Sequence, residues 1–174
     1  PLPTGGYLEQ ADGTAWMALY CQNMLDIASA LADERPAYLA MCRKFVEHFL
    51  WIASSMVHAG SDVGMWDEED GFFYDLLRLP DGQAIRLKVR SMVGLLPLCA
   101  STVFEADAVT RNPKLMELIA QFRKRHPELV SQVAPTDAGF IGYKERRLLS
   151  ILNKQKLERV LGYLLDENEF LGPH

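Results

Sequence analysis

The sequence of 174 residues lacks features that several classes of protein require. Its longest apolar segments, residues 45–57 and 92–104, are interrupted by polar residues and are shorter than the roughly 18 residues of a membrane span. Positive charge is scarce, because 18 Lys and Arg oppose 23 Asp and Glu and leave a net charge of −5. A nucleic-acid-binding surface needs clustered cations that displace counterions. We therefore expect a protein that neither spans a membrane nor binds nucleic acid.

Cysteine is also scarce, and no cofactor motif is present. Cys21, Cys42 and Cys99 form no C-x-x-C pair and lie among apolar residues, which indicates reduced, buried thiols and a cytoplasmic protein. The four histidines show no metal-ligand spacing. A Gly-rich phosphate loop, a nucleophile elbow and a zinc signature are all missing from the sequence. The residues therefore predict no metal site and no cofactor.

The remaining composition is that of a globular protein. Apolar residues make up 49% and charged residues 24%, which argues against disorder and coiled coil, and the length suits one domain. The chain begins with Pro1 instead of Met and ends at His174, just after an apolar segment. We expect residues 1–174 to be a single fragment of a larger domain, truncated at both ends.

The first half of the chain predicts two helices. Residues 1–11 are rich in Pro and Gly and predict an ordered loop, and Asp12 stands at the N-cap position of a helix over residues 13–32. In that helix, apolar residues recur at spacings of three and four, which predicts that they face the core: Met17, Tyr20, Met24, Ile27 and Leu31.

A second helix is expected over residues 37–58, with Gly60 as its stop. Its polar residues form only a narrow stripe: Arg43, Lys44, Glu47, Ser54, Ser55 and His58. A surface helix normally buries one face and solvates the other, so this helix needs neighbours on two or more sides. A double-layered helical toroid provides such neighbours.

The following segment changes from helical to strand periodicity. Residues 72–79 and 83–89 flank Pro80-Asp81-Gly82 and predict a β-hairpin, with an acidic turn over residues 66–70 beside it. Farther on, the patterns predict these elements: a helix over 92–105 capped by Ser91 and kinked or split at Pro97, a helix over 113–125, a short helical turn over 127–133, a loop over 134–142, a strand or helical turn over 145–151, and a last helix capped by Asn153. The predicted class is mainly α with one inserted hairpin.

Three segments carry residues suited to chemistry. In residues 5–16, Glu9 and Asp12 precede a helix that opens with Trp16, although residue statistics alone favour Asp12 as an N-cap. Residues 66–75 join Trp66 to four consecutive acids, but an EF-hand would place Trp66 at loop position one, where an acid is needed.

That acidic segment is either a solvated turn into the hairpin or an aromatic and carboxylate rim for a polyhydroxylated ligand. The third segment is residues 87–98. Its Arg90 either holds a substrate or the acidic loop, or pairs as a hairpin-end cation with Asp67 or Glu69.

Together these segments resemble the (α/α)6-toroid catalytic domain of glycoside hydrolase family 63, the family of processing α-glucosidase I, and in particular its bacterial glucosidase-like members. The resemblance extends over nearly the whole chain and is weakest over residues 112–147. It is carried by residues 8–20, 66–75, 89–98 and 166–173, which include Leu8-Glu9-Gln10-Ala11-Asp12-Gly13-Thr14-Ala15-Trp16 and Val89-Arg90-Ser91-Met92-Val93-Gly94.

The resemblance implies part of an inverting glycoside hydrolase that acts on α-glucosidic bonds of an oligosaccharide or α-glucoside. Asp12 matches the general acid, and the family's base is expected beyond His174. The implied substrate-binding residues are Glu9, Trp16, Trp66, Asp67 and Arg90. The remaining toroid helices of the parent chain, or self-association, would cover the exposed faces, and the isolated fragment would be inactive. The alternative is a non-catalytic helical module that binds carbohydrate or protein.

Overall fold

The computed structural model describes residues 2–3, 5–57, 63–106, 113–127 and 142–172. Helices form the largest part of these residues, which confirms the mainly α class. The α-helices are α1 (Ala11–Glu34), α2 (Leu39–Val57), α4 (Pro113–Arg125) and α6 (Lys154–Leu164). Short 3-10 helices are η1 (Pro36–Tyr38), η2 (Met92–Gly94), η3 (Leu96–Cys99) and η4 (Tyr143–Glu145). Within these ranges, no helix is long and apolar enough to cross a membrane.

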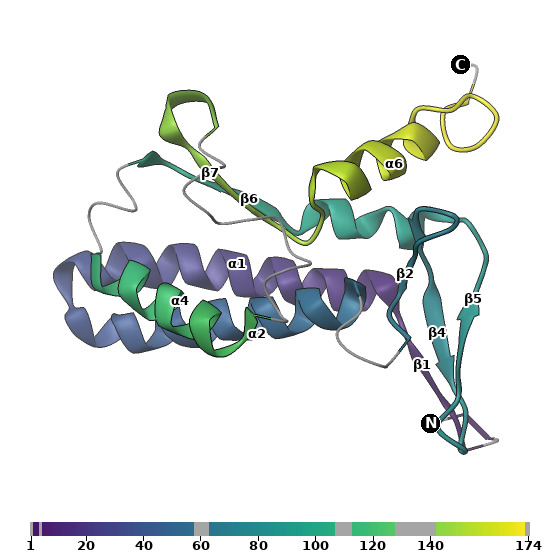
Figure 1. Cartoon of the computed structure of the whole chain (residues 1–174), viewed down its shortest axis with the longest axis horizontal. Coiled ribbons are helices and arrows are strands. Elements are labelled where there is room, and N and C mark those ends of the chain that lie inside the picture. Colours follow the sequence, from purple (N-terminus) through teal and green to yellow (C-terminus); the bar gives the residue numbers. More distant parts are fainter. Residues whose placement is uncertain (1, 4, 58–62, 107–112, 128–141, 173–174) are drawn as a thin grey trace.

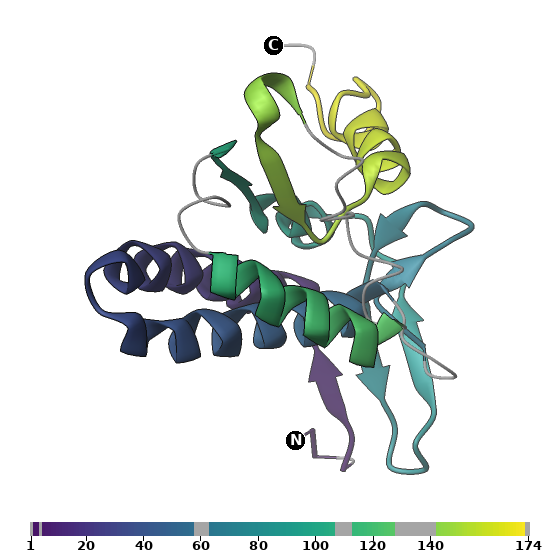
Figure 2. The same cartoon turned by 60° about the vertical axis from the view of Figure 1, so that its left-hand side comes forward.

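The helices form a layer to which small sheets are attached. Helices α1 and α2 run side by side and α4 packs on α2, while η2 and η3 pack on α1 (Figure 1). Three strands stand at one end of the helix pair, where α1 begins: β1 (Tyr7–Glu9), β4 (Asp75–Arg78) and β5 (Ala84–Leu87). Helix α6 lies on the side of α1 opposite α4 (Figure 2). The start of α1 therefore lies where the helical layer meets the sheet.

Helix α1 packs through small residues, and its predicted core face is wrong. Its buried residues are mostly alanines: Ala11, Ala15, Ala18, Cys21, Gln22, Leu25, Ala28 and Ala32. Among the residues predicted to face the core, Met24 is half-buried, but Met17, Tyr20, Ile27 and Leu31 are 39–53% exposed. Small side chains allow α2 and η3 to approach α1 closely. The helix is therefore buried along its stripe of alanines, which is less hydrophobic than the stripe of large apolar residues that the prediction chose.

Helix α2 meets the expectation of neighbours on more than one side, because it packs on both α1 and α4. It begins at Leu39, after η1, and not at Ala37. Ser54, which the sequence assigns to the polar stripe, is instead fully buried. His58 and Gly60 lie outside the described residues.

The predicted hairpin is confirmed over its central part. Strand β4 (Asp75–Arg78) pairs antiparallel with β5 (Ala84–Leu87), and Gly82 takes a φ of +85° in the turn. The flanks differ from prediction, because β3 (Phe72–Phe73) pairs with β2 (Trp66–Asp67) and not with the far end of the hairpin. Residues 7–9, expected as loop, form β1 (Tyr7–Glu9) and pair with β4, giving the sheet order β1-β4-β5.

The second half of the chain follows the predicted caps but not the predicted helix over residues 92–105. The amide of Val93 donates to Ser91 Oγ at 3.3 Å. In place of one helix the chain forms two 3-10 turns, η2 and η3, and Pro97 lies in the first turn of η3. The chain then extends as β6 (Ser101–Phe104), which pairs with β7 (Arg147–Ser150), so the strand alternative for residues 145–151 is correct.

Two other expectations for this half are confirmed. Helix α4 spans the predicted 113–125, and the amide of Lys156 donates to the cap Asn153 Oδ1 at 2.9 Å. Residues 128–141, which contain most of the predicted turn and loop, lie outside the described residues.

The cysteines match their prediction. Cys21 and Cys42 are buried, Cys99 is half-buried, and all three are free thiols. Burial raises the pKa of each thiol. A raised thiol pKa disfavours the thiolate, the form that acts as a nucleophile.

Candidate functional site

A cavity of about 600 Å³ lies at the start of α1. Its walls come from the end of β1, the first turn of α1, the last turns of α2, the segment before β2, and β4. The lining residues are Leu8, Glu9, Gln10, Gly13, Thr14, Trp51, Ser54, Ser55, Val63, Gly64, Met65 and Arg78. One of the sequence-predicted site residues, Glu9, lines this cavity, and Asp12 occupies the turn between two of its lining residues.

Among the described lining residues, one carboxylate and one guanidinium are present, and they pair with each other. Arg78 Nε donates to Glu9 Oε1 at 3.2 Å. The antiparallel register of β1 and β4 brings these residues together, since Tyr7 stands opposite Arg78 and Glu9 opposite Leu76. Glu9 and Arg78 also line a second hollow of about 440 Å³ near the hairpin turn. The ion pair therefore lies between two solvent-accessible spaces.

The first turn of α1 is capped from a distance and not by Asp12. Gln10 occupies the N-cap position without a side-chain hydrogen bond, and the amide of Ala11 donates to Asp75 Oδ1 of β4 at 2.7 Å. The predicted cap role of Asp12 is therefore wrong. Asp12 lies inside the first turn, half-buried, and its carboxylate accepts the adjacent Gly13 amide at 2.6 Å.

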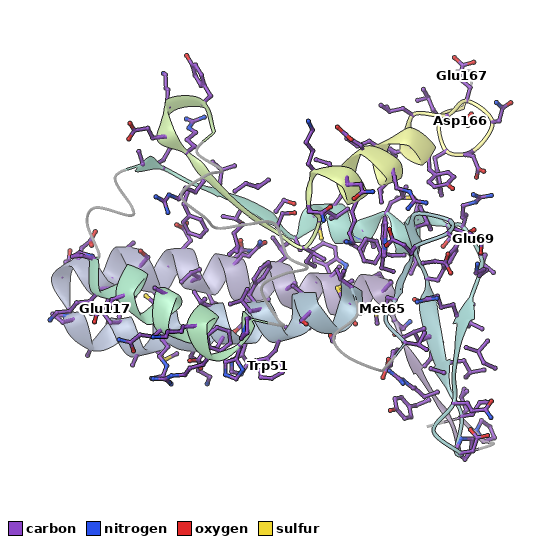
Figure 3. All side chains as sticks on the ribbon, in the orientation of Figure 1. Trp51, Met65, Glu69, Glu117, Asp166 and Glu167 are labelled. Carbon is purple, nitrogen blue, oxygen red and sulfur yellow. The ribbon has the colours of Figure 1, made fainter. Side chains whose placement is uncertain are left out.

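The α2 wall presents hydroxyl groups and an aromatic ring. Ser55 Oγ donates to the carbonyl of Ile52 at 2.8 Å, whereas Ser54 Oγ has no hydrogen-bond partner among the described residues. Trp51 is half exposed, and its ring meets His126 at a centroid distance of 5.6 Å. Figure 3 shows Trp51 on α2 and Met65 near the start of α1. This lining of hydroxyls, amides and one indole suits a neutral, polyhydroxylated ligand.

Trp66 and Asp67, also predicted to bind substrate, lie in β2 and do not line this cavity. Trp66 is only 3% exposed, and its Nε1 donates to Glu68 Oε2 at 2.6 Å. The cations of Lys156 and Arg159 lie 5.5 and 5.8 Å from the centroid of the Trp66 ring. The indole is therefore part of the interior between β2 and α6.

Basic side chains from β5, the segment after it and α6 form ion pairs and hydrogen bonds with the acidic turn over residues 66–70. Lys88 Nζ contacts Asp67 Oδ2 at 3.1 Å and Asp70 Oδ2 at 3.2 Å, and Arg86 Nη1 donates to Asp67 Oδ2 at 3.3 Å. Arg159 donates to the carbonyls of Glu68 and Glu69 at 2.7 Å each. The acidic turn is thus neither simply solvated nor an open rim. Among the described residues, no group of three or more His, Cys, Asp or Glu is arranged to hold a metal ion.

These contacts shift the acidity of Asp67. Burial alone would raise its pKa, but the hydrogen bond from the Asp70 amide at 2.8 Å and the charges of Lys88 and Arg86 outweigh it, and the pKa lies below its ordinary value. A carboxyl group whose pKa is lower in the folded state stabilises the fold above its unfolded pKa. This stabilisation disappears as the pH falls through the folded pKa.

Replacement of Asp67 by Asn should therefore lower the free energy of unfolding at pH 7 by about 1–2 kcal/mol, since the basic partners are partly exposed and screened. The difference from wild type should begin to shrink below about pH 4, where the Asp67 carboxyl of the unfolded chain takes up a proton, and should vanish below the lower pKa of the folded state. Urea titrations at several pH values measure both effects. Glu69→Gln, at an exposed neighbouring acid, is the control. A loss in the free energy of unfolding of Asp67→Asn that stays constant down to pH 2 would contradict the electrostatic explanation.

Arg90 and Trp16 complete the predicted set, and neither lines the cavity. Arg90 Nη2 pairs with Glu169 Oε1 at 3.2 Å, and its guanidinium lies 4.8 Å from the centroid of the Tyr163 ring. The expected pairing of Arg90 with Asp67 or Glu69 is wrong, because Arg86 and Lys88 are the cations that contact Asp67. Trp16 is half exposed on α1.

The structure thus divides the predicted residues between two places. Glu9 and Asp12 lie at the start of α1, while Trp66 and Arg90 contact α6 and the segment that follows it, and Asp67 pairs with the end of the hairpin. The lining residues that the sequence analysis missed include Arg78, Trp51 and Ser54. No local pattern distinguishes them, because they reach the cavity only through the pairing of β1 with β4 and the packing of α2 on α1.

Comparison with known proteins gives one informative similarity. The chain is 38% identical, over 187 aligned residues, to uncharacterized protein YMR196W of Saccharomyces cerevisiae. The alignment covers 100% of this chain and 17% of the yeast protein, so the chain spans less than a fifth of the length of that relative. No family model matches the chain. No solved structure matches it either.

Proposed function

We propose that the chain is part of an inverting glycoside hydrolase of α-glucosidic bonds, resembling family 63, and that it supplies the general-acid loop and part of the sugar-binding wall. The observation that carries the proposal is the cavity at the start of α1. Glu9, Arg78, Trp51 and several hydroxyl groups surround it, and Asp12 lies in the turn that forms one of its edges.

The chemistry assigns Asp12 the role of proton donor. In an inverting enzyme one carboxylic acid protonates the leaving oxygen, and a second carboxylate activates water from the opposite face of the sugar. Asp12 is placed in the first turn of a long helix, and strand β4 holds that turn through Asp75. In the proposal the base belongs to a segment beyond His174.

The substrate contacts of the proposal come from the cavity lining. Glu9 accepts hydrogen bonds from sugar hydroxyls, Arg78 orients Glu9, and the exposed indole of Trp51 offers a face for a sugar ring. Trp66, Asp67 and Arg90 act less directly. Trp66 contacts Lys156 of α6, and Arg90 pairs with Glu169 after it. Asp67 binds Lys88 and Arg86, so these residues stabilise the structure around β2 and the end of the hairpin.

The proposal places the helices within an (α/α)6 toroid. A toroid helix packs on neighbours at both sides, and α1 has an apolar stripe that the described segments leave partly exposed: Trp16, Met17, Tyr20, Ile27 and Leu31. These residues lie 39–54% exposed on one side of the helix. Contiguous apolar surface of this kind is typical of an interface. Further helices of a longer chain would cover it, in keeping with the greater length of the yeast relative.

The 174-residue chain on its own should therefore self-associate. A stripe of about 400 Å² corresponds to roughly 10 kcal/mol of apolar burial, which is comparable to the whole stability of a domain. Size-exclusion chromatography with light scattering measures the mass. The double variant Met17→Glu, Ile27→Glu should shift the population toward monomer, and Asn23→Glu, at an exposed polar position of the same helix, serves as its control. A wild-type monomer with a sharp thermal transition would contradict the expectation.

The hydrolase proposal is tested on the full-length protein with maltose, nigerose and trehalose. Proton NMR resolves the two anomers of glucose as they form. Inversion should release the glucose that is cleaved at its C1 as the β-anomer, so trehalose should at first give α- and β-glucose in equal amounts. Release of α-glucose alone from trehalose would contradict the inverting mechanism. A folded protein that binds these sugars without cleaving them would favour the alternative, a non-catalytic carbohydrate-binding module.

A further inference from the structure

The α2 wall of the cavity contains a polar atom whose hydrogen bond is missing. Among the described residues, two buried side-chain polar atoms lack a partner, Gln22 Oε1 and Ser54 Oγ. Gln22 is held in the interior by its other end, since Nε2 donates to the carbonyl of Leu149 at 2.8 Å. Ser54 differs from Gln22, because it is fully buried yet lines the cavity at the start of α1.

An unpaired hydroxyl at this position is unfavourable for the ligand-free protein. Buried polar groups are nearly always paired, and leaving one unpaired costs the desolvation of that group. The neighbouring hydroxyls of the lining are satisfied within their own helices. Ser55 donates to Ile52, and Thr14 Oγ1 donates to the carbonyl of Gln10 at 2.7 Å. Among the described hydroxyl groups of the lining, Ser54 Oγ is therefore the one that lacks a hydrogen-bond partner.

We propose that Ser54 is a ligand-binding residue whose hydroxyl forms a hydrogen bond with a hydroxyl group of the bound sugar. This inference rests on the proposed function and adds a specificity-determining contact to the same cavity. A hydroxyl both donates and accepts, so it matches a sugar hydroxyl in either role.

The charges of the lining favour a neutral ligand. Among the described lining residues, one is acidic and one is basic, Glu9 and Arg78, and their charges neutralise each other at 3.2 Å. A neutral sugar therefore needs hydroxyl partners more than ionic ones, and Ser54 provides one. A ligand that lacks the corresponding hydroxyl would leave Ser54 unpaired and bind more weakly.

The test is Ser54→Ala in the full-length protein, with maltose as the probe and Ser29→Ala as the control. Ser29 lies within α1, half-buried and away from the cavity, and it controls for the higher helix propensity of alanine. Isothermal titration calorimetry is done in the Asp12→Asn background, which cleaves maltose slowly, and it should show maltose binding weakened about tenfold by Ser54→Ala and unchanged by Ser29→Ala. Without ligand, hydrogen exchange in the α2 peptide around residue 54 should be slower in Ser54→Ala than in wild type, by about fivefold or more.

The outcomes separate this inference from the proposed function. If wild type and Ser54→Ala bind maltose equally, the contact is overturned while the glycosidase proposal stands. If Ser54→Ala binds more weakly but its α2 peptide exchanges faster, the hydroxyl supports the fold and is not a ligand contact, which also overturns the inference. If wild type neither binds nor cleaves an α-glucoside, the proposed function fails, and the inference fails with it.

Discussion

Asp12→Asn in the full-length protein should reduce kcat on α-glucosides by about 10²–10⁴-fold, the usual contribution of a general acid. Asparagine keeps the size of the side chain and can still accept the Gly13 amide, so the first turn of α1 should remain folded. Only the proton needed by the leaving oxygen is lost. Steady-state kinetics with maltose measures the effect, and a decrease of less than tenfold would rule out Asp12 as the acid.

Two comparisons distinguish lost acid catalysis from a structural defect. Asp26→Asn changes an exposed acid farther along the same helix and should leave kcat unchanged. α-Glucosyl fluoride has a leaving group that needs little protonation, so Asp12→Asn should cleave it at a rate much closer to that of wild type. A variant equally defective on maltose and on the fluoride would point to disturbed geometry and not to the missing proton.

Gly94→Ala should lower the free energy of unfolding by about 3 kcal/mol, at the upper end of the usual cost of overpacking. Gly94, in η2, packs directly on β3. A Cβ atom at this position would overlap the ring of Phe72 and the backbone carbonyl oxygen of Phe73. The ring is fully buried, and the carbonyl belongs to the backbone of β3, so neither can move aside easily.

Urea titration followed by tryptophan fluorescence measures this change, and α6 provides the matched control. Gly162 lies within α6, and a Cβ atom there would meet nothing within 4 Å. Gly162→Ala should therefore raise stability by about 0.5–1 kcal/mol through helix propensity alone. Gly94→Ala with wild-type stability would show that η2 can move away from β3, contrary to the packing described here.

The expectations that held depend on short stretches of chain. Asn153 and Ser91 cap the turns that follow them, because each side chain accepts a hydrogen bond from a backbone amide two or three residues away. The Asp81-Gly82 turn likewise predicts its hairpin, since Gly82 adopts the positive φ that the reversal requires. Such local interactions need no knowledge of the rest of the fold.

The face of α1 shows where a local pattern is ambiguous. Two stripes of the helix have helical periodicity, one of large apolar residues and one of small residues such as Ala15 and Ala28. Hydrophobicity favours the first stripe, but the structure buries the second, because α2 and η3 pack closely where the side chains are small. Choosing between two such stripes requires the neighbouring elements, which the helix's own sequence does not reveal.

The candidate site depended even more on contacts distant in sequence. Glu9 and Asp12 could be singled out from residue type and position, but the partner that caps α1 and the partner that holds Glu9 could not. Asp75 lies 64 residues from Ala11, and Arg78 lies 69 residues from Glu9. Both arrive through the pairing of β1 with β4. Local chemistry decided where the turns and helix ends form, whereas the site arose from strand pairing and helix packing, whose free energy comes from residues that are neighbours only in the folded chain.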